Sequence, residues 1–177
     1  MYTYRRLSHD DLDTICEFPQ TEEELYFVSP RCKYPLTSEQ ILELLKDRFE
    51  PTVVIDAVVN KVVAYANLYG HDPSDCSCWL GNVIVSPEYR GKGAAEFLVK
   101  MMIQEANNKF GIHTIQLSCH NTNSRGLAFY YKHGFKPFDM KITMLEGRKV
   151  ITIQMKTENR NQESGIRPKG ANFNDKS

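Results

Sequence analysis

The sequence lacks an excess of charge of either sign, because its 177 residues carry 22 Lys and Arg against 22 Asp and Glu. Without a net field, the composition gives no reason to expect binding to nucleic acid or to an anionic membrane. No apolar run approaches the roughly 20 residues that span a bilayer. The charged start Tyr2–Arg6 is not followed by the apolar stretch of a signal peptide. We therefore expect a cytoplasmic protein with no nucleic-acid or membrane partner.

Cysteine is sparse and does not occur in paired motifs. The five cysteines are Cys16, Cys32, Cys76, Cys78 and Cys119. An odd number of scattered cysteines without an export signal indicates reduced thiols. The segment Cys76–Cys78 is a C-x-C with no second pair, and alternation along a strand explains it as well as a metal site does. We expect no metal.

The length and the ordinary composition, 41% hydrophobic and 25% charged, suit one domain with a sizeable core. Hydrophobic periodicity and turn residues predict the elements. The predicted helices cover residues 8–16, 37–50 (ended by Pro51), 91–110 and 123–133. The predicted strands cover residues 2–7, 52–59, 62–69, 78–85, 114–119, 138–145 and 149–155. Residues 21–36 show neither pattern and are expected to be irregular.

This order of elements predicts an α+β fold with a mixed, mostly antiparallel sheet of about seven strands, flanked by about four helices. There is no internal repeat and no sign of a second domain. The predicted domain covers residues 1–156. Residues 157–177 have almost no apolar side chains, so we expect a disordered tail.

The first informative segment joins an apolar strand to a helix through small residues, and reads Asn82-Val83-Ile84-Val85-Ser86-Pro87-Glu88-Tyr89-Arg90-Gly91-Lys92-Gly93-Ala94-Ala95. Two glycines let the backbone approach a ligand, and the N-terminus of the helix adds partial positive charge. Such a turn suits a pyrophosphate, to which Arg90 and Lys92 could add charge. A tight strand-to-helix connection without a ligand is equally compatible with this segment alone. It is neither a Walker A loop nor a dinucleotide fingerprint.

The second segment is Asn123-Ser124-Arg125-Gly126-Leu127-Ala128-Phe129-Tyr130-Tyr131-Lys132-His133-Gly134-Phe135. It resembles the N-x-x-[AS]-x-x-[LF]-Y-x-x-x-G-F element of the GNAT superfamily of N-acetyltransferases, with Tyr130 at the tyrosine position. Arg90 to Ala95 is similar to the Q/R-x-x-G-x-G/A pyrophosphate loop of the same superfamily. The two motifs occur in the family's order, and the resemblance covers roughly Val53 to Met155. Ala95 stands where many members have glycine.

The resemblance implies acetyl-CoA as cosubstrate and a primary amine as acceptor. It implies that the strand residues Val83, Ile84 and Val85 offer main-chain groups to the pantetheine arm. The loop would hold the pyrophosphate through Arg90, Gly91, Lys92, Gly93, Ala94 and Ala95. Asn123 would lie beside the thiol end, and Tyr130 would donate a proton to the departing thiolate.

A phenol such as Tyr130, with a pKa of about 10 that lies above that of a free thiol, is a competent general acid at this step. Aromatic residues at helical spacing usually serve packing, and Phe129 and Tyr131 lie beside Tyr130. The register of the motif favours the catalytic role.

The general base is less defined. Some relatives place a glutamate five residues before the asparagine, where this chain has Ser118, a poor base. His120 would share a strand face with Ser118, and its ordinary pKa near 6.5 suits a base. A loop histidine bonded to backbone is the alternative. Deprotonation through water is the default expectation.

The acceptor itself stays open: a protein N-terminus, a lysine side chain, a polyamine, an aminoglycoside or another small amine. Residues 21–36 and the last hairpin are the candidate surface, where Glu22, Glu23 and Glu24 either attract a cation or form a solvated charge run. A non-catalytic acyl-CoA sensor is the alternative function, and a phosphate-binding regulator of unrelated fold is a third. We expect a monomer or homodimer.

Overall fold

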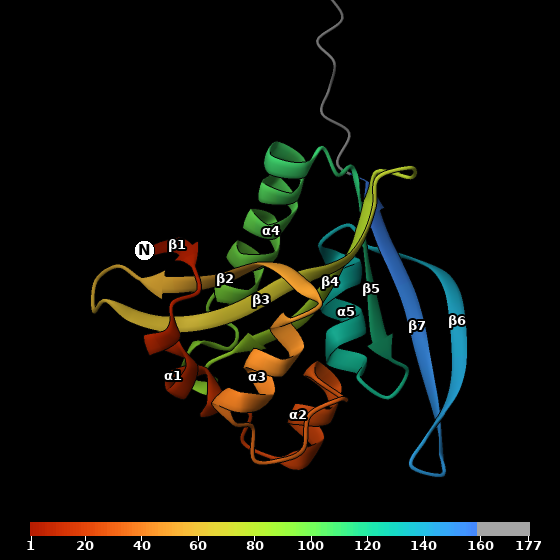
Figure 1. Ribbon diagram of the computed structural model, residues 1–177, viewed down its shortest axis with the longest axis horizontal. Coiled ribbons are helices and arrows are strands. Elements are labelled where there is room, and N and C mark those ends of the chain that lie inside the picture. Colours follow the sequence, from red (N-terminus) through yellow and green to blue (C-terminus); the bar gives the residue numbers. More distant parts are fainter. Residues whose placement is uncertain (159–177) are drawn as a thin grey trace, which may run out of the picture.

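The computed structural model describes residues 1–158 (Figure 1). The strands are β1 (Tyr2–Arg6), β2 (Arg48–Asp56), β3 (Lys61–Asp72), β4 (Ser77–Val85), β5 (Thr114–His120), β6 (Lys136–Leu145) and β7 (Arg148–Glu158). The α-helices are α1 (Leu12–Cys16), α2 (Glu22–Val28), α3 (Ser38–Leu45), α4 (Ala94–Phe110) and α5 (Ser124–Lys132). Two short 3₁₀ turns, η1 (His9–Asp11) and η2 (Pro87–Tyr89), precede α1 and α4.

The seven strands form one sheet in the order β1-β2-β3-β4-β5-β7-β6. Every neighbouring pair is antiparallel except β4 and β5, which are parallel. The parallel ladder has only three rungs, from Ser77 opposite Thr114 to Trp79 opposite Gln116. This confirms the predicted α+β class and the mixed, mostly antiparallel sheet.

Helices cover both faces of the sheet (Figure 1). On one face, Leu98 and Met102 of α4 pack fully buried against Leu68 and Leu80 of the central strands. On the other face, the core consists of buried apolar residues of α1, α2, α3, β2, β3 and β4: Leu12, Ile15, Leu25, Ile41, Val53, Tyr65 and Ile84. The sheet therefore separates two cores, and a gap in it connects the two sides.

The structure corrects two of the predicted elements. Residues 22–28, expected to be irregular, form helix α2, whose N-cap Thr21 accepts a hydrogen bond from the backbone N–H of Glu24. A seven-residue helix is too short to show a clear 3.6-residue period. Pro51 does not end a helix: α3 stops at Leu45, and Pro51 lies in β2 at a register shift between Phe49 and Thr52. At such an irregularity the missing N–H of proline breaks no ladder bond.

The last strand extends beyond the predicted domain boundary. Thr157 and Glu158 pair with Ile115 and Thr114 of β5, so both belong to the sheet and not to a tail. The rest of the predicted tail, residues 159–177, lies outside the described residues. Within the described part of the chain, no helix is long and apolar enough to cross a membrane. The cytoplasmic location stays a prediction.

A buried carboxylate fixes the start of the chain against the first helix. Asp11 accepts two hydrogen bonds from Arg5, at 2.6 and 2.8 Å, and one from the backbone N–H of Ser8, at 2.7 Å. Its side chain is only 6% exposed. These bonds, first those from Arg5, hold the pKa of the Asp11 carboxyl below its usual range.

We expect Asp11→Asn to lower the free energy of unfolding by about 1–3 kcal/mol at pH 7, because a charged acceptor loses its bonds. A depressed carboxyl pKa stabilises the fold above the unfolded-state value of about 3.9, and this contribution disappears as pH falls through the folded-state pKa. The difference between variant and parent should therefore shrink below about pH 4. Urea unfolding at several pH values measures it.

Asp10→Asn is the matched control, since Asp10 is exposed in the same turn. An equal loss in both variants, or a difference that does not depend on pH, would contradict the role of Asp11.

Candidate active site

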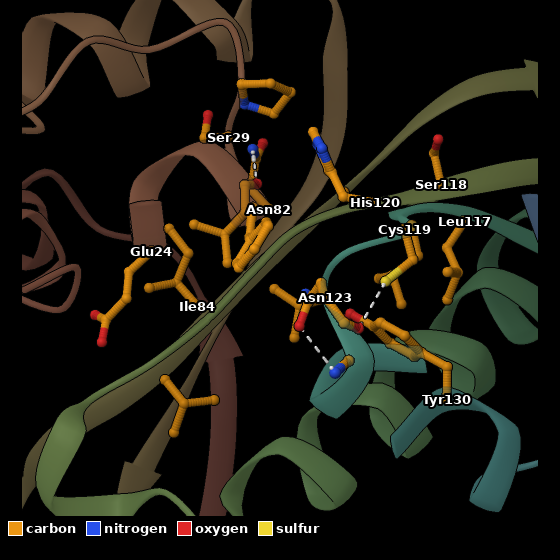
Figure 2. Close-up of a pocket in the computed structure, with 18 of the residues that line it drawn as sticks. Glu24, Ser29, Asn82, Ile84, Leu117, Ser118, Cys119, His120, Asn123 and Tyr130 are labelled. Carbon is orange, nitrogen blue, oxygen red and sulfur yellow. Dashed lines mark hydrogen bonds between the residues drawn. The ribbon is translucent and has the colours of Figure 1, made fainter. Parts of the chain in front are cut away.

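The separation of β4 from β5 creates the main cavity of the described chain. Beyond Trp79 and Gln116 the two strands no longer pair, and a cavity of about 690 Å³ opens between Leu80–Val85 and Leu117–His120. Figure 2 shows Asn82 and Ile84 on β4 on one side of this opening, and Asn123 and Tyr130 on the other. The size is typical of a small-molecule site.

Strand β4 carries a bulge at the cavity. Between the pairs Tyr65–Ile84 and Asn67–Gly81, β4 has one residue more than β3. Asn82 takes up the extra residue with a left-handed φ of 51°. Its side chain donates to the backbone carbonyl of Val28 at 3.0 Å and accepts from Asn67 at 2.9 Å. These hydrogen bonds connect the bulge to α2 and to the centre of the sheet. The bulge bends β4 and changes the direction of its backbone at the opening.

The loop before α4 presents unused hydrogen-bond donors. Gly91 and Gly93 have φ values of 73° and 84°, which favour glycine. A Cβ added at either glycine would meet nothing within 4 Å, so the space beside them is open. Within the described residues, the backbone N–H groups of Gly91, Gly93, Ala94 and Ala95 donate to no group. Open space beside free N–H groups at a helix N-terminus fits an anion such as a pyrophosphate.

The two cationic side chains of this loop are placed differently from one another. Arg90, expected to add charge beside a phosphate, instead donates two hydrogen bonds to Glu24 of α2, at 2.9 and 3.0 Å. It also donates to the backbone carbonyls of Phe18, at 3.0 Å, and Val85, at 3.3 Å. Lys92 lies over the ring of Tyr89, with its Nζ 5.7 Å from the ring centroid. Arg90 therefore joins the loop to α2.

Asn123 has a structural role at the start of α5. Its Oδ1 accepts a hydrogen bond from the backbone N–H of Gly126 at 3.0 Å, which caps the helix. A Cβ at Gly126 would lie 2.5 Å from the Asn123 amide nitrogen, so a larger residue there would displace the Asn123 side chain from this position. The amide also lines the cavity. Capping and ligand contact are compatible, because the cap uses only the oxygen.

Tyr130 lies on α5 with its ring packed between Phe129 and Phe135, at centroid distances of 5.2 and 5.7 Å. Its hydroxyl has no hydrogen-bond partner within residues 1–158, and the residue lines the cavity. Burial, and next the neighbouring Cys119, raise the pKa of the Tyr130 phenol above its usual value. The proton therefore stays on this oxygen at neutral pH.

His120 is the last residue of β5 and is 5% exposed. Its ring contacts two aromatic rings of α2, Tyr26 at 4.5 Å and Phe27 at 5.8 Å between centroids. Within the described chain the ring makes no hydrogen bond, so it is not the backbone-bonded loop histidine of the alternative interpretation. Burial lowers the pKa of the His120 ring, which favours the neutral form.

Ser118 shares the side of β5 on which His120 projects, whereas Leu117 and Cys119 point the other way (Figure 2). The Ser118 hydroxyl accepts a hydrogen bond of 3.0 Å from Gln154 of β7. Gln154 is 2% exposed, and its amide also donates to Thr152. The serine hydroxyl is therefore oriented by the neighbouring strand and keeps its own proton to donate.

Sequence reasoning missed Arg48 at the cavity. Its side chain is 9% exposed, donates to Asn67 at 3.0 Å and lies over the ring of Tyr69 at 4.1 Å. A Cβ at Gly81 would lie 2.2 Å from its Nη1, so this glycine makes room for the guanidinium. Gly81, in the middle of an apolar strand, is the signal that a side chain from another strand crosses there.

Within residues 1–158, no three His, Cys, Asp or Glu side chains are grouped so that they could hold a metal ion. Cys78 is fully buried, and burial raises the pKa of its thiol to about 12. Cys78 lies in β4, whereas Cys76 precedes the strand in a turn, with a left-handed φ of 48°, and is partly exposed. Alternation along one strand, which would place both thiols on the same face, therefore does not explain this segment.

Comparison with known proteins identifies the class. The model of the acetyltransferase (GNAT) family matches residues 12–135, well over half of the chain. The chain therefore belongs to the acetyltransferase (GNAT) family and is an acetyltransferase. The resemblance of the two motifs to that superfamily is confirmed.

Solved structures share the fold. The spermidine N-acetyltransferase of Vibrio cholerae, in complex with CoA and spermine, matches with a TM-score of 0.73 and 20% identity, over 89% of this chain and 95% of that chain. A putative phosphinothricin N-acetyltransferase matches with a TM-score of 0.70 and 20% identity, over 89% of this chain and 98% of that chain. At such identities the likeness establishes the α+β architecture alone.

We expect the His120 ring to titrate below its usual value near 6.5, because the charged form is desolvated between α2 and β5. Two-dimensional NMR of the histidine side chains against pH measures the midpoint.

A lowered folded-state pKa also means that the unfolded chain binds more protons than the folded protein between the two pKa values. His120 therefore contributes a loss of stability as pH falls from about 6.5 toward its folded pKa. His120→Gln should remove that contribution, and a midpoint above 6.5 would contradict the assignment.

Proposed function

We propose that this protein transfers an acetyl group from acetyl-CoA to a primary amine by direct attack of the amine on the thioester. Membership of the acetyltransferase (GNAT) family supports the reaction class. One structural neighbour is described in complex with CoA and spermine, which supports both acetyl-CoA and an amine. The site residues below are part of the proposal.

The loop Arg90–Ala95 would hold the pyrophosphate through its backbone. The free N–H groups of Gly91, Gly93, Ala94 and Ala95 and the open space beside the glycines support this assignment. The unpaired edge of β4 at Val83, Ile84 and Val85 would bind the pantetheine arm as an added strand does. Lys92 would add charge from the rim of the loop. Arg90 would not contact the pyrophosphate but would hold the loop in place, because its side chain already binds Glu24.

The observation that carries the proposal is that the Tyr130 hydroxyl, at the cavity between β4 and β5, has no hydrogen-bond partner within residues 1–158. Acetyl-CoA supplies the activated acetyl group when bound. As the amine nitrogen forms its bond to the acetyl carbon and the carbon–sulfur bond breaks, Tyr130 would give its proton to the sulfur. Asn123, beside it, would contact the same end through its free amide hydrogens.

A raised pKa alone would make the Tyr130 phenol a weaker acid. Proton transfer also depends, however, on the pKa of the thiol that departs. Burial raises the pKa of the adjacent Cys119 thiol to about 11. The pKa of a thiol released in the same surroundings would be raised similarly, because the same desolvation disfavours the charged thiolate. Burial thus raises the pKa values of both the phenol and the thiol, which offsets part of the effect of the raised phenol pKa on proton transfer.

The amine must lose a proton before attack, and His120 is the proposed acceptor. Its ring is neutral, buried and free of hydrogen bonds within the described residues, and it lines the same cavity. We propose that the proton passes to it through a water molecule. Ser118, oriented by Gln154, would donate to the tetrahedral intermediate or to that water. The amine would lose two protons in all: the first leaves before attack, through water to His120, and His120 later releases it to solvent. The second would leave the nitrogen of the tetrahedral intermediate and replace, on Tyr130, the proton that the phenol gives to the sulfur.

We expect Gly93→Asp to weaken acetyl-CoA binding by on the order of ten-fold or more, because a carboxylate then lies beside the pyrophosphate. Gly93→Asn is the matched control: asparagine has the same shape, tolerates a left-handed φ and carries no charge. Isothermal calorimetry of both folded variants separates charge from backbone strain. Equal affinity in Gly93→Asp and the parent would exclude the loop.

We expect Tyr130→Phe to lower turnover by roughly ten- to a thousand-fold while acetyl-CoA affinity and thermal stability stay nearly unchanged. The change removes the proton and keeps the packed ring. Tyr131→Phe is the control, since Tyr131 is 57% exposed and faces away beneath Lys136. CoA release with an identified amine gives the rates.

An equal loss in both tyrosine variants would indicate packing, and full activity in Tyr130→Phe would remove the general acid. A sensor without catalysis would instead bind acetyl-CoA and release no CoA with any amine.

A further inference from the structure

The acceptor side of the site is cationic. A second cavity of about 630 Å³ adjoins the first and shares Arg31, Tyr69, Ser118 and His120 with it. The cationic side chains that line the two cavities are Arg31, Arg48, Arg90, Arg125 and Lys141. Only two carboxylates do so: Glu24 pairs with Arg90, and Asp47 pairs with Arg31 and, at 3.7 Å, with Arg48. The five cations therefore exceed the carboxylates by three. A charge distribution of this kind attracts an anion and repels a polycation.

Arg48 is the most constrained of these cations. Its side chain is nine-tenths buried, and its Nε is the one buried side-chain polar atom within residues 1–158 that has no hydrogen-bond partner. The nearest carboxylate oxygen, on the exposed Asp47, is 3.7 Å from Nε. Burial lowers the pKa of Arg48. A guanidinium that is desolvated and incompletely paired gains from a bound carboxylate, which accepts two parallel hydrogen bonds.

The guanidinium also lies close to the reacting strand. It occupies the space that a side chain at Gly81 would fill, next to the bulge at Asn82. Asn67, which accepts its hydrogen bond, donates in turn to Asn82. An anion held by Arg48 would therefore be near the point where β4 and β5 separate, beside Ser118 and His120. That proximity suits a molecule whose amine and anion are few bonds apart.

We propose that the acceptor is an amine that carries a carboxylate, an amino acid in chemical class, and that Arg48 binds the carboxylate with Arg31 and Lys141 around it. This inference rests on the proposed function, since it assigns the acceptor of that reaction. Lys141 comes from β6, with its Nζ 5.5 Å from the centre of the Trp79 ring. The aromatic walls of Tyr69 and Trp79 leave room for an apolar side chain.

The experiment compares the L-amino acids with their C-terminal amides, together with spermidine, as acceptors. An amide removes the negative charge and keeps the size. It also lowers the pKa of the amine and thus supplies more free amine, so without an anion site the amides should react faster. We expect kcat/KM to favour the acids by ten-fold or more for at least one pair, on the order of a charged hydrogen bond, with spermidine poorer still.

Three variants test the residue. Arg48→Gln should lower kcat/KM for the acids by roughly ten- to a hundred-fold and for the amides by less than about three-fold. Arg48→Lys should keep part of the preference for acids over amides. Lysine keeps the positive charge but lacks the two parallel N–H donors of the guanidinium. Asp47→Asn, at an exposed position, should act in the opposite direction and lower KM for the acids a few-fold. If Arg48 had a purely structural role, Arg48→Gln and Asp47→Asn would not change the kinetics of the acids in opposite directions.

Binding of acetyl-CoA, measured by calorimetry on the same samples, separates the two proposals. Amides or spermidine reacting as well as the acids, or Arg48→Gln affecting acids and amides alike, would overturn the carboxylate site and leave the acetyltransferase proposal intact. If acetyl-CoA binds and no amine reacts, the acids and amides are titrated against the CoA complex. Absence of carboxylate-dependent binding there overturns the inference. Absence of acetyl-CoA binding would overturn both.

Discussion

The parallel contact between β4 and β5 ends after three rungs, and the site depends on that early end. Backbone groups of a sheet interior are normally paired, so two strands that separate leave edges for other partners. β5 satisfies its far edge by pairing with β7 along its whole length, whereas β4 is bulged and anchored to α2 through Asn82. The gap is thus held open from both sides. Helix α4 starts at the end of β4 and α5 at the end of β5, which brings two helix N-termini to one opening.

The two faces of the sheet differ in chemistry at this opening. On the face of α4 and α5, Tyr130 packs against a core of buried apolar residues that includes Leu80 and Cys119, and this burial raises the pKa of its phenol. On the opposite face, Arg48, Asn67 and Gln154 form buried polar contacts whose hydrogen bonds fix side-chain positions. The first environment suits the release of a sulfur anion, and the second suits orientation of a polar acceptor. The sheet keeps the two environments apart and joins them only through the gap.

Local sequence was enough to predict the parts that depend on local geometry. The strand, glycine turn and helix around Gly91 and Gly93, and the helix that carries Tyr130, lie within two short segments and followed from strand and helix periodicity. The positions of Asn123 and Tyr130 in the site came from the family resemblance, and the cap that Asn123 forms was not predicted. The fold class followed for the same reason. The parts that depend on contacts between distant segments could not be predicted. Arg48 reaches the cavity because β2 pairs with β3 and β3 with β4, and Glu24 meets Arg90 across 66 residues. Helix α2 was missed because seven residues do not define a period.

The pair formed by Glu24 and Arg90 links helix α2 to the loop that precedes α4. Arg90 also holds the carbonyl of Phe18, and Glu24 in turn accepts from the backbone N–H of Gln20. The stretch from Phe18 to Glu24 is therefore joined to the loop before α4 both by an ion pair and by a backbone contact. If this stretch were replaced in a related chain, Arg90 would need a new carboxylate or carbonyl to accept its hydrogen bonds. Without one, its side chain would no longer be held beside the loop. A change of sequence in this stretch would therefore also affect the position of the loop before α4.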